Sequence, residues 1–220
     1  MTILDNLSPL RSRSGNVRSP GLDDATVLRL SAQFPDLNIA AQRAADALPA
    51  LIAEFADLID ADEQAQIEAA QSGFINFYPD DAISPYVAIA ACGPWIITSK
   101  GRVLHDSGGY GMLGFGHTPD AVIAAMAEPQ VMANIMSPSF SQLRVAKALR
   151  AEIGHTRGTC PYSKFLTLNS GSESVSLAGR IADTNTKLHT DPGGRHAGKR
   201  VKRIAMKGAF HGRTELPCLR

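Results

Sequence analysis

One turn constrains this chain more than any other feature: residues 169–174, which join an apolar segment to an amphipathic helix. Residues 164–168 (KFLTL) are typical of a buried strand. The helix is predicted to begin at the Gly-Ser of the turn, because apolar residues then recur at helical spacing. Backbone N–H groups and the helix dipole favour a phosphate or carboxylate at such a turn. Ser170-x-x-Glu173 is also the pattern of a capping box, so the turn taken alone favours a plain helix start over an anion site.

A second motif, residues 208–212 (GAFHG), favours the anion-site interpretation. It follows residues 201–206, which we expect to form another strand. The motif presents an aromatic ring and an imidazole between glycines. A phosphate cradle beside a flat ring suits a planar, phosphorylated cofactor.

Together these motifs resemble the class III, pyridoxal-phosphate-dependent aminotransferases. Residues 169–173 (NSGSE) and 210–214 (FHGRT) carry most of the resemblance. Residues 101–106 (GRVLHD) resemble the strand that opens the family's pattern, and residues 109–119 (GYGMLGFGHTP) resemble its glycine-rich turn. The resemblance covers roughly residues 75–214, with the motifs in the family's order.

The resemblance implies an α/β fold, that of the large domain of fold type I enzymes that depend on pyridoxal 5'-phosphate (PLP). We expect residues 1–73 to form a flexible terminus and a helical N-terminal extension. Residues 74–220 are then the N-terminal segment and first part of the PLP-binding domain, with an incomplete mixed sheet flanked by helices.

The resemblance also assigns a cofactor site. Gly171 and Ser172 would hold the phosphate, Phe210 would lie against the pyridine ring, and His211 would sit beside that ring. Tyr110 is the candidate contact to the substrate. Two departures from the family pattern affect details of this region. Ser176 stands where many members have a second glutamate, and residues 116–119 are one residue shorter than the usual turn.

The implied reaction is transamination between an amine or amino acid and a keto acid, in a homodimer. Aminomutase and decarboxylation chemistry occur on related sites. The family's Schiff-base lysine and the aspartate that protonates the pyridine nitrogen lie downstream of the Phe-His-Gly motif. We therefore expect this chain to be an N-terminal part that carries no catalytic residue and is inactive alone. Lys207 precedes the motif and does not match the lysine position.

Two other functions fit parts of the sequence. A truncated enzyme can serve as a cofactor-free interaction module. Gly109-x-Gly111-x-x-Gly114 formally matches the fingerprint of nicotinamide-dependent oxidoreductases. The sequence around Glu128-Pro129, however, lacks the second strand and acidic residue which that fold requires.

Composition argues against several other classes. A net charge of +1 gives no reason to expect nucleic acid or an acidic membrane as partner. Three widely spaced cysteines predict no disulfide scaffold and favour the cytoplasm. The longest apolar run, residues 86–97, is too short to span a membrane. His189 and His196 have no carboxylate or cysteine at a suitable spacing, so we expect no metal site.

Local patterns predict the remaining elements. Residues 39–59 are helical, and we expect a break at Pro49. A further helix should run from residue 63 to Gln71. Residues 96–98 and 102–104 should form a hairpin. Helices should also follow Pro119 and a serine cap at Ser139 or Ser141.

Overall fold

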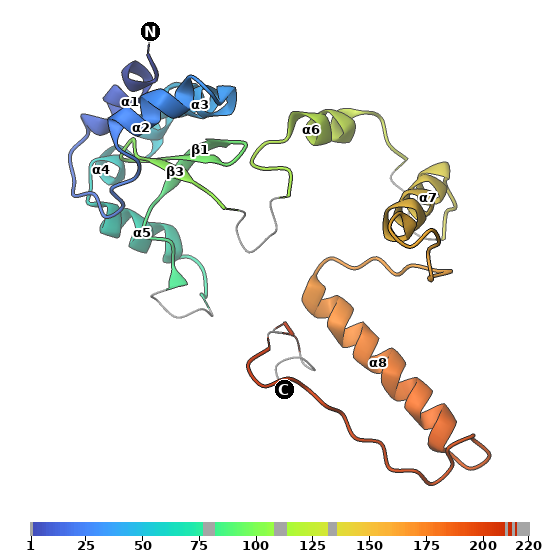
Figure 1. Cartoon of the computed structure of the whole chain (residues 1–220). Helices are drawn as coiled ribbons and strands as arrows, with labels where there is room; N and C mark the ends of the chain where they lie inside the picture. The colour runs from blue at the N-terminus through green and yellow to red at the C-terminus, as the bar shows by residue number, and fades with distance from the viewer. Residues whose placement is uncertain are drawn as a thin grey trace. The chain divides into compact units, whose positions relative to one another are not determined.

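The computed structural model is a mixed α/β structure in which residues 2–76, 82–107, 114–131, 136–209, 211, 212 and 214 are described. The chain divides into two compact units, Met1–Gln130 and Val131–Arg220 (Figure 1). The first unit contains α1 (Ile3–Arg11), α2 (Asp24–Ser31), α3 (Pro35–Glu54), α4 (Ala56–Ile59), α5 (Glu63–Gln71), β1 (Ala88–Cys92), β2 (Trp95–Thr98), β3 (Val103–His105) and α6 (Asp120–Ala127). The second contains α7 (Phe140–Gly154) and α8 (Gly171–Thr190).

The sheet of the first unit has three antiparallel strands in the order β1-β2-β3. The predicted hairpin is β2 and β3, and Gly101 takes the positive φ of 64° that its turn needs. β1 was not predicted, because its alanine-rich sequence contains only one β-branched residue, Ile89, and such residues are typical of strands. β1 pairs with β2 across Gly93-Pro94, which makes β2 the central strand. All four residues of β2 are buried.

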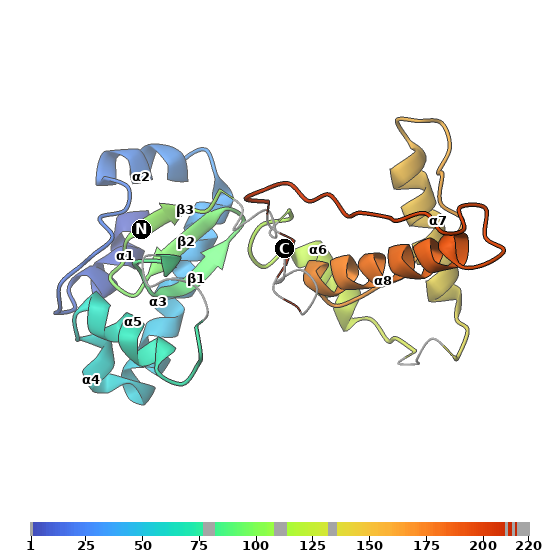
Figure 2. The same ribbon diagram turned by 90° about the horizontal axis from the view of Figure 1, so that it is seen from below.

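α3 covers one face of this sheet and packs on β1 and β2 (Figure 2). Its buried side recurs at helical spacing and is rich in alanine, which lets the helix lie close to the strands. Leu37 and Leu48 fill the space at the two ends of that side. The buried residues of α3 are Leu37, Ala40, Ala41, Ala44 and Leu48.

The expected flexible terminus is wrong for α1. Ile3, Leu7 and Leu10 are buried in the same core as α3, and α1 packs directly on that helix. Three apolar residues at positions i, i+4 and i+7 explain the helix. The polar and basic composition of the first twenty residues concealed that spacing.

The break expected at Pro49 is also wrong. α3 continues through Pro49 to Glu54, and the chain leaves helical geometry at Phe55 (φ −129°, ψ 45°). Proline in a helix interior removes one hydrogen bond. Here the apolar face on both sides of it, Leu48 before and Leu51 and Ile52 after, packs on the core and keeps the helix continuous.

The predicted helix from residue 63 to Gln71 is confirmed as α5, with Asp62 at its N-cap position. The Asp62 carboxylate does not cap that helix. It accepts hydrogen bonds from the backbone N–H and the side chain of Asn16, at 2.7 and 3.1 Å. These two bonds lower the pKa of Asp62. The N-terminal segment is thus held against the start of α5.

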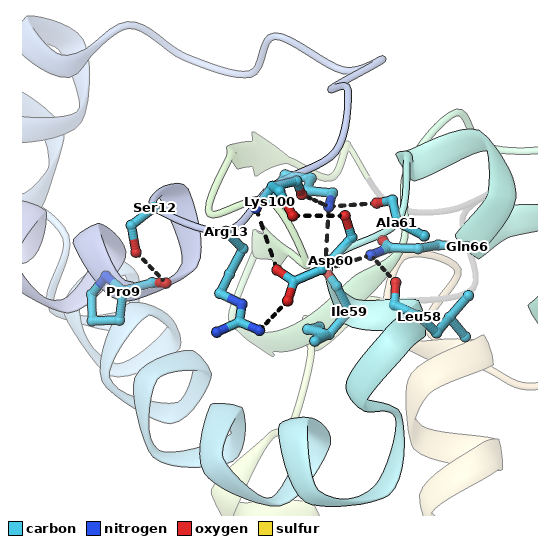
Figure 3. A network of polar contacts seen from close by, with 10 residues as sticks. Pro9, Ser12, Arg13, Leu58, Ile59, Asp60, Ala61, Gln66 and Lys100 are labelled. Atoms are coloured by element: carbon cyan, nitrogen blue, oxygen red, sulfur yellow. Dashed lines mark hydrogen bonds and ion pairs between the residues drawn. The ribbon is translucent and has the colours of Figure 1, made fainter.

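A buried lysine joins the hairpin to that same region (Figure 3). Lys100 lies in the turn between β2 and β3 and is only 2% exposed. Its ammonium donates to the carbonyl oxygens of Ser14 (2.6 Å), Ala61 (2.6 Å) and Ile59 (3.2 Å). Burial lowers the pKa of Lys100, although the carboxylates of Asp60, Glu63 and Asp62 act in the opposite direction.

The second unit has a different interior. The predicted helices after Ser139 and after Ser170 are confirmed as α7 and α8, each starting with a capping box. The segments expected as strands, residues 164–168 and 201–206, are not strands in the structure. Among the described residues of this unit, no apolar side chain is buried. Across the described residues of both units, no helix combines the length and the apolar character that crossing a membrane requires.

Candidate functional site

The first turn of α8 is fixed by the capping box that the sequence predicts. Glu173 Oε2 accepts from the backbone N–H of Ser170 (3.0 Å) and Asn169 (3.1 Å), and Ser170 Oγ accepts from the N–H of Glu173 (3.2 Å). In this network the N–H groups of the two residues just before the helix both donate to the Glu173 side chain. It also gives the turn one defined conformation before any ligand arrives.

The capping box leaves part of the turn available. Among the described residues, the N–H of Gly171 donates no hydrogen bond. Space is open around Gly171, since a Cβ there would meet nothing within 4 Å. An N–H at the positive end of a twenty-residue helix is suited to an anion. The Glu173 carboxylate lies at the same end and accepts hydrogen bonds from the N–H groups of Asn169 and Ser170.

The second motif returns to this turn. After α8 the chain runs back along the helix (Figure 1), and an ion pair joins Arg203 to Asp183 on the way. Thr214 Oγ1 donates to the carbonyl oxygen of Ser172 at 3.1 Å. Residues more than forty positions apart are thus brought together at the start of α8.

Gly212 is the point of closest approach between the two motifs. Its φ is 104°, which favours glycine. A Cβ at this position would lie 2.7 Å from Ser172 Cβ and 2.8 Å from Ser172 Cα. Only a residue without a side chain permits this contact, so Gly212 seats directly on the first turn of α8. We use the term 211–214 loop for its described residues, His211, Gly212 and Thr214.

Two of the predicted site residues lie beside this contact, and two lie outside the described residues. His211 is half-buried, and its Nε2 atom is buried without a hydrogen-bond partner in the described part of the chain. Ser172 is also half-buried. A buried nitrogen without a partner carries a cost that a ligand would remove. Phe210 and Tyr110 fall outside the residues that the structure describes.

The glycine-rich motif of the first unit has its own polar pair. His117 Nε2 lies 3.1 Å from Asp106 Oδ2, and the backbones of Gly93 and His117 form an isolated antiparallel bridge. Gly116, with φ 73°, packs against Gly93 so closely that a Cβ would lie 2.8 Å from Gly93 Cα. The shortened turn is therefore held by the hairpin between β1 and β2. We did not predict this pair, although Asp106 and His117 both lie in the matched motifs.

Sequence reasoning also missed contacts in the second unit. Arg150 of α7 donates to the carbonyl oxygen of Ser163 (2.7 Å) and lies over the ring of Phe165. Thr214 and Ser176 bring their hydroxyl oxygens to 2.6 Å of each other. Both contacts join segments distant in sequence, so no local pattern signals them.

His189 and His196 place their rings 6.2 Å apart at the end of α8. Across the described ranges, no group of three or more histidine, cysteine, aspartate or glutamate residues could hold a metal ion.

Comparison with known proteins gives one match. A family model described as Aminotransferase class-III matches residues 78–218, more than half of the chain. No curated protein and no solved structure gives a match. The matched range contains both motifs that meet at α8 and the glycine-rich motif of the first unit. The chain belongs to the class III aminotransferase family, whose members depend on PLP.

Proposed function

We propose that the protein carrying this chain catalyses PLP-dependent transamination between an amine or amino acid and a keto acid. Membership of the class III family supports the reaction class and the cofactor. We further propose that residues 74–220 form the N-terminal segment and first part of a PLP-binding domain of fold type I. Residues 1–73 are then a helical extension, and the complete protein is a homodimer.

In this proposal the start of α8 binds the cofactor phosphate. The N–H of Gly171 and the hydroxyl of Ser172 donate to phosphate oxygens, and the helix dipole adds to the attraction. The Gly171 N–H, which no described residue accepts, and the open space around it fit such a group. When bound, PLP supplies an electron sink for the bond changes at the substrate's amine-bearing carbon.

The loop of residues 211–214 orients the ring. Phe210 lies against one face of the pyridine, and His211 sits beside the ring, where its buried Nε2 gains a partner. Tyr110 borders the substrate channel. We assign no catalytic acid, base or nucleophile to this chain. Its proposed role is to bind and orient.

One observation carries this proposal: the 211–214 loop is seated on the first turn of α8, with Gly212 against Ser172. A phosphate site and a ring-binding loop serve one ligand only if they are adjacent. The contacts of Gly212 and Thr214 with Ser172, about forty positions earlier in the chain, support this arrangement.

The test is spectroscopic. The complete protein is purified with PLP and its yellow absorption band is recorded while amines and amino acids are added one at a time. A transaminase is expected to lose that band with an accepted donor and to regain it with a keto acid. A band that no amine or amino acid changes would contradict the assignment.

A further inference from the structure

We propose that Ser176 and Thr214 form a pair of positioning residues that locks the 211–214 loop onto α8 and thereby sets the affinity for PLP. This inference rests on the proposed function and deepens it. Neither residue is among those assigned to the cofactor. Both are half-buried, one on the second turn of α8 and the other at the far end of the loop.

The hydrogen-bond inventory fixes the direction of the pair. A threonine hydroxyl has one proton to donate. Thr214 donates it to the carbonyl oxygen of Ser172, at 3.1 Å. The 2.6 Å contact between the two hydroxyl oxygens must then use the proton of Ser176, with Thr214 as acceptor. The result is a short relay from Ser176 through Thr214 to the backbone of Ser172.

This relay holds the far end of the loop, at Thr214. Upstream, the returning segment is attached to α8 by the ion pair of Arg203 with Asp183, which is half-exposed and therefore weak. His211 and Gly212 lie between that ion pair and the relay. Their position over the first turn of α8 depends on the relay, because a glycine at φ 104° has wide conformational freedom when it is not restrained.

The relay also holds the backbone of the proposed phosphate site, because it ends on the carbonyl oxygen of Ser172. Ser172 contributes its carbonyl oxygen to Thr214 and its hydroxyl, in our proposal, to the cofactor phosphate. The hydrogen bond from Thr214 holds the Ser172 carbonyl in place, and with it the peptide plane between Ser172 and Glu173. This peptide belongs to the first turn of α8, so the turn is held as well. Without the relay, the loop must become ordered when PLP binds, and this ordering carries a free-energy cost. Binding is then weaker although every group that touches the ligand is still present.

The experiment titrates the complete, cofactor-free protein with PLP and follows the absorption change. The variants are Thr214→Val, Ser176→Ala and the double substitution. Thr214→Ser is the rescue, since it retains the hydroxyl. The matched control is Thr184→Val, because Thr184 is exposed on α8 and its hydroxyl only donates to the carbonyl oxygen of Arg180 within the helix.

We expect each single variant to bind PLP about tenfold more weakly, the value for one or two net hydrogen bonds. The double variant should bind no more weakly than Thr214→Val, because both substitutions break one relay. Thr214→Ser and Thr184→Val should bind within about twofold of the wild type. Hydrogen exchange in the cofactor-free protein should show the amides of His211 and Gly212 exchanging faster in Thr214→Val and in Ser176→Ala than in the wild type and in Thr184→Val.

The outcomes separate the two proposals. A wild type that binds no PLP overturns the proposed function. A wild type that binds PLP while Thr214→Val binds equally well overturns the positioning role. Unchanged exchange at residues 211 and 212 in Thr214→Val overturns the loop-locking role whatever the cofactor does. A Thr184→Val variant that binds PLP as weakly as Thr214→Val would also overturn the positioning role, because a general loss of helix stability would then account for the weaker binding.

Discussion

At the residue scale, the site depends on two glycines with different duties. Gly171 leaves space at the start of α8 and an N–H that has no partner in the described part of the chain, whereas Gly212 permits close contact between the loop and the helix. The sequence identified both positions, because Ser-Gly-Ser-Glu and Phe-His-Gly are local patterns. It did not identify Thr214 as a contact of Ser172 and Ser176, since that contact is made only when the chain has folded back.

Gly212→Ala tests the close contact. Gly208 is the matched control, because both glycines have positive φ, 104° and 78°, and only Gly212 has neighbours where a Cβ would go. Backbone strain of about 1–2 kcal/mol is therefore common to both alanine variants. The clash with Ser172 belongs to Gly212→Ala alone.

We expect Gly212→Ala to bind PLP at least about tenfold more weakly than Gly208→Ala, because the loop must shift away from α8. Isothermal titration of both variants beside the wild type gives the comparison. Equal affinities for the two alanine variants would mean that the contact between Gly212 and Ser172 has no part in binding.

At the element scale, local signals predicted most helices and the β2–β3 hairpin. Capping boxes, apolar periodicity and a glycine turn each act within a few residues. The predictions were wrong where packing against residues distant in sequence determines the local structure. α3 passes through Pro49 because its apolar face continues on both sides, and residues 164–168 and 201–206 have strand-like sequences without a neighbouring strand among the described residues. A strand is defined by its partner, which its own sequence does not specify.

The Lys100 turn provides a test of how the elements of the first unit are joined. Lys100→Met keeps the length of the side chain but removes the donor to three carbonyl oxygens. At neutral pH we expect a loss of about 2 kcal/mol in the free energy of unfolding, because buried acceptors lose their partner. Lys147→Met, at an exposed site on α7, should change it by less than about 0.5 kcal/mol.

The pH dependence of that difference has a defined sign. Burial lowers the pKa of Lys100 in the folded state, so the folded protein releases this proton at lower pH than the unfolded chain does. Between the two pKa values the unfolded chain binds more protons, and stability contributed by this group rises with pH. Urea unfolding of the wild type and Lys100→Met across the alkaline range below the ordinary lysine pKa measures it. An advantage of the wild type that shrinks over this range would contradict the lowered pKa.

At the scale of the whole molecule, the two units differ in how they bury apolar surface. The core of the first unit joins α1, α3 and the sheet, and β2 is buried throughout. In the second unit, side chains such as Phe140 (78% exposed) and Ile204 (97% exposed) remain in solvent. Burial is the main favourable term in folding, so stability should be concentrated in the first unit.

Native-state hydrogen exchange measures this distribution. We expect the amides of Ile96 and Ile97 in β2 to be among the slowest to exchange, at rates set by global unfolding of their unit. Amides in the middle of α7 should exchange at least about tenfold faster. Equal protection in β2 and α7 would show that the second unit has a core of comparable strength.

The most direct test of the central claim is a crystal structure of the complete protein with PLP. We predict the phosphate within hydrogen-bonding distance of the Gly171 N–H and the Ser172 hydroxyl, with His211 beside the pyridine ring. A phosphate bound away from the first turn of α8, or a ring remote from His211, would contradict the account.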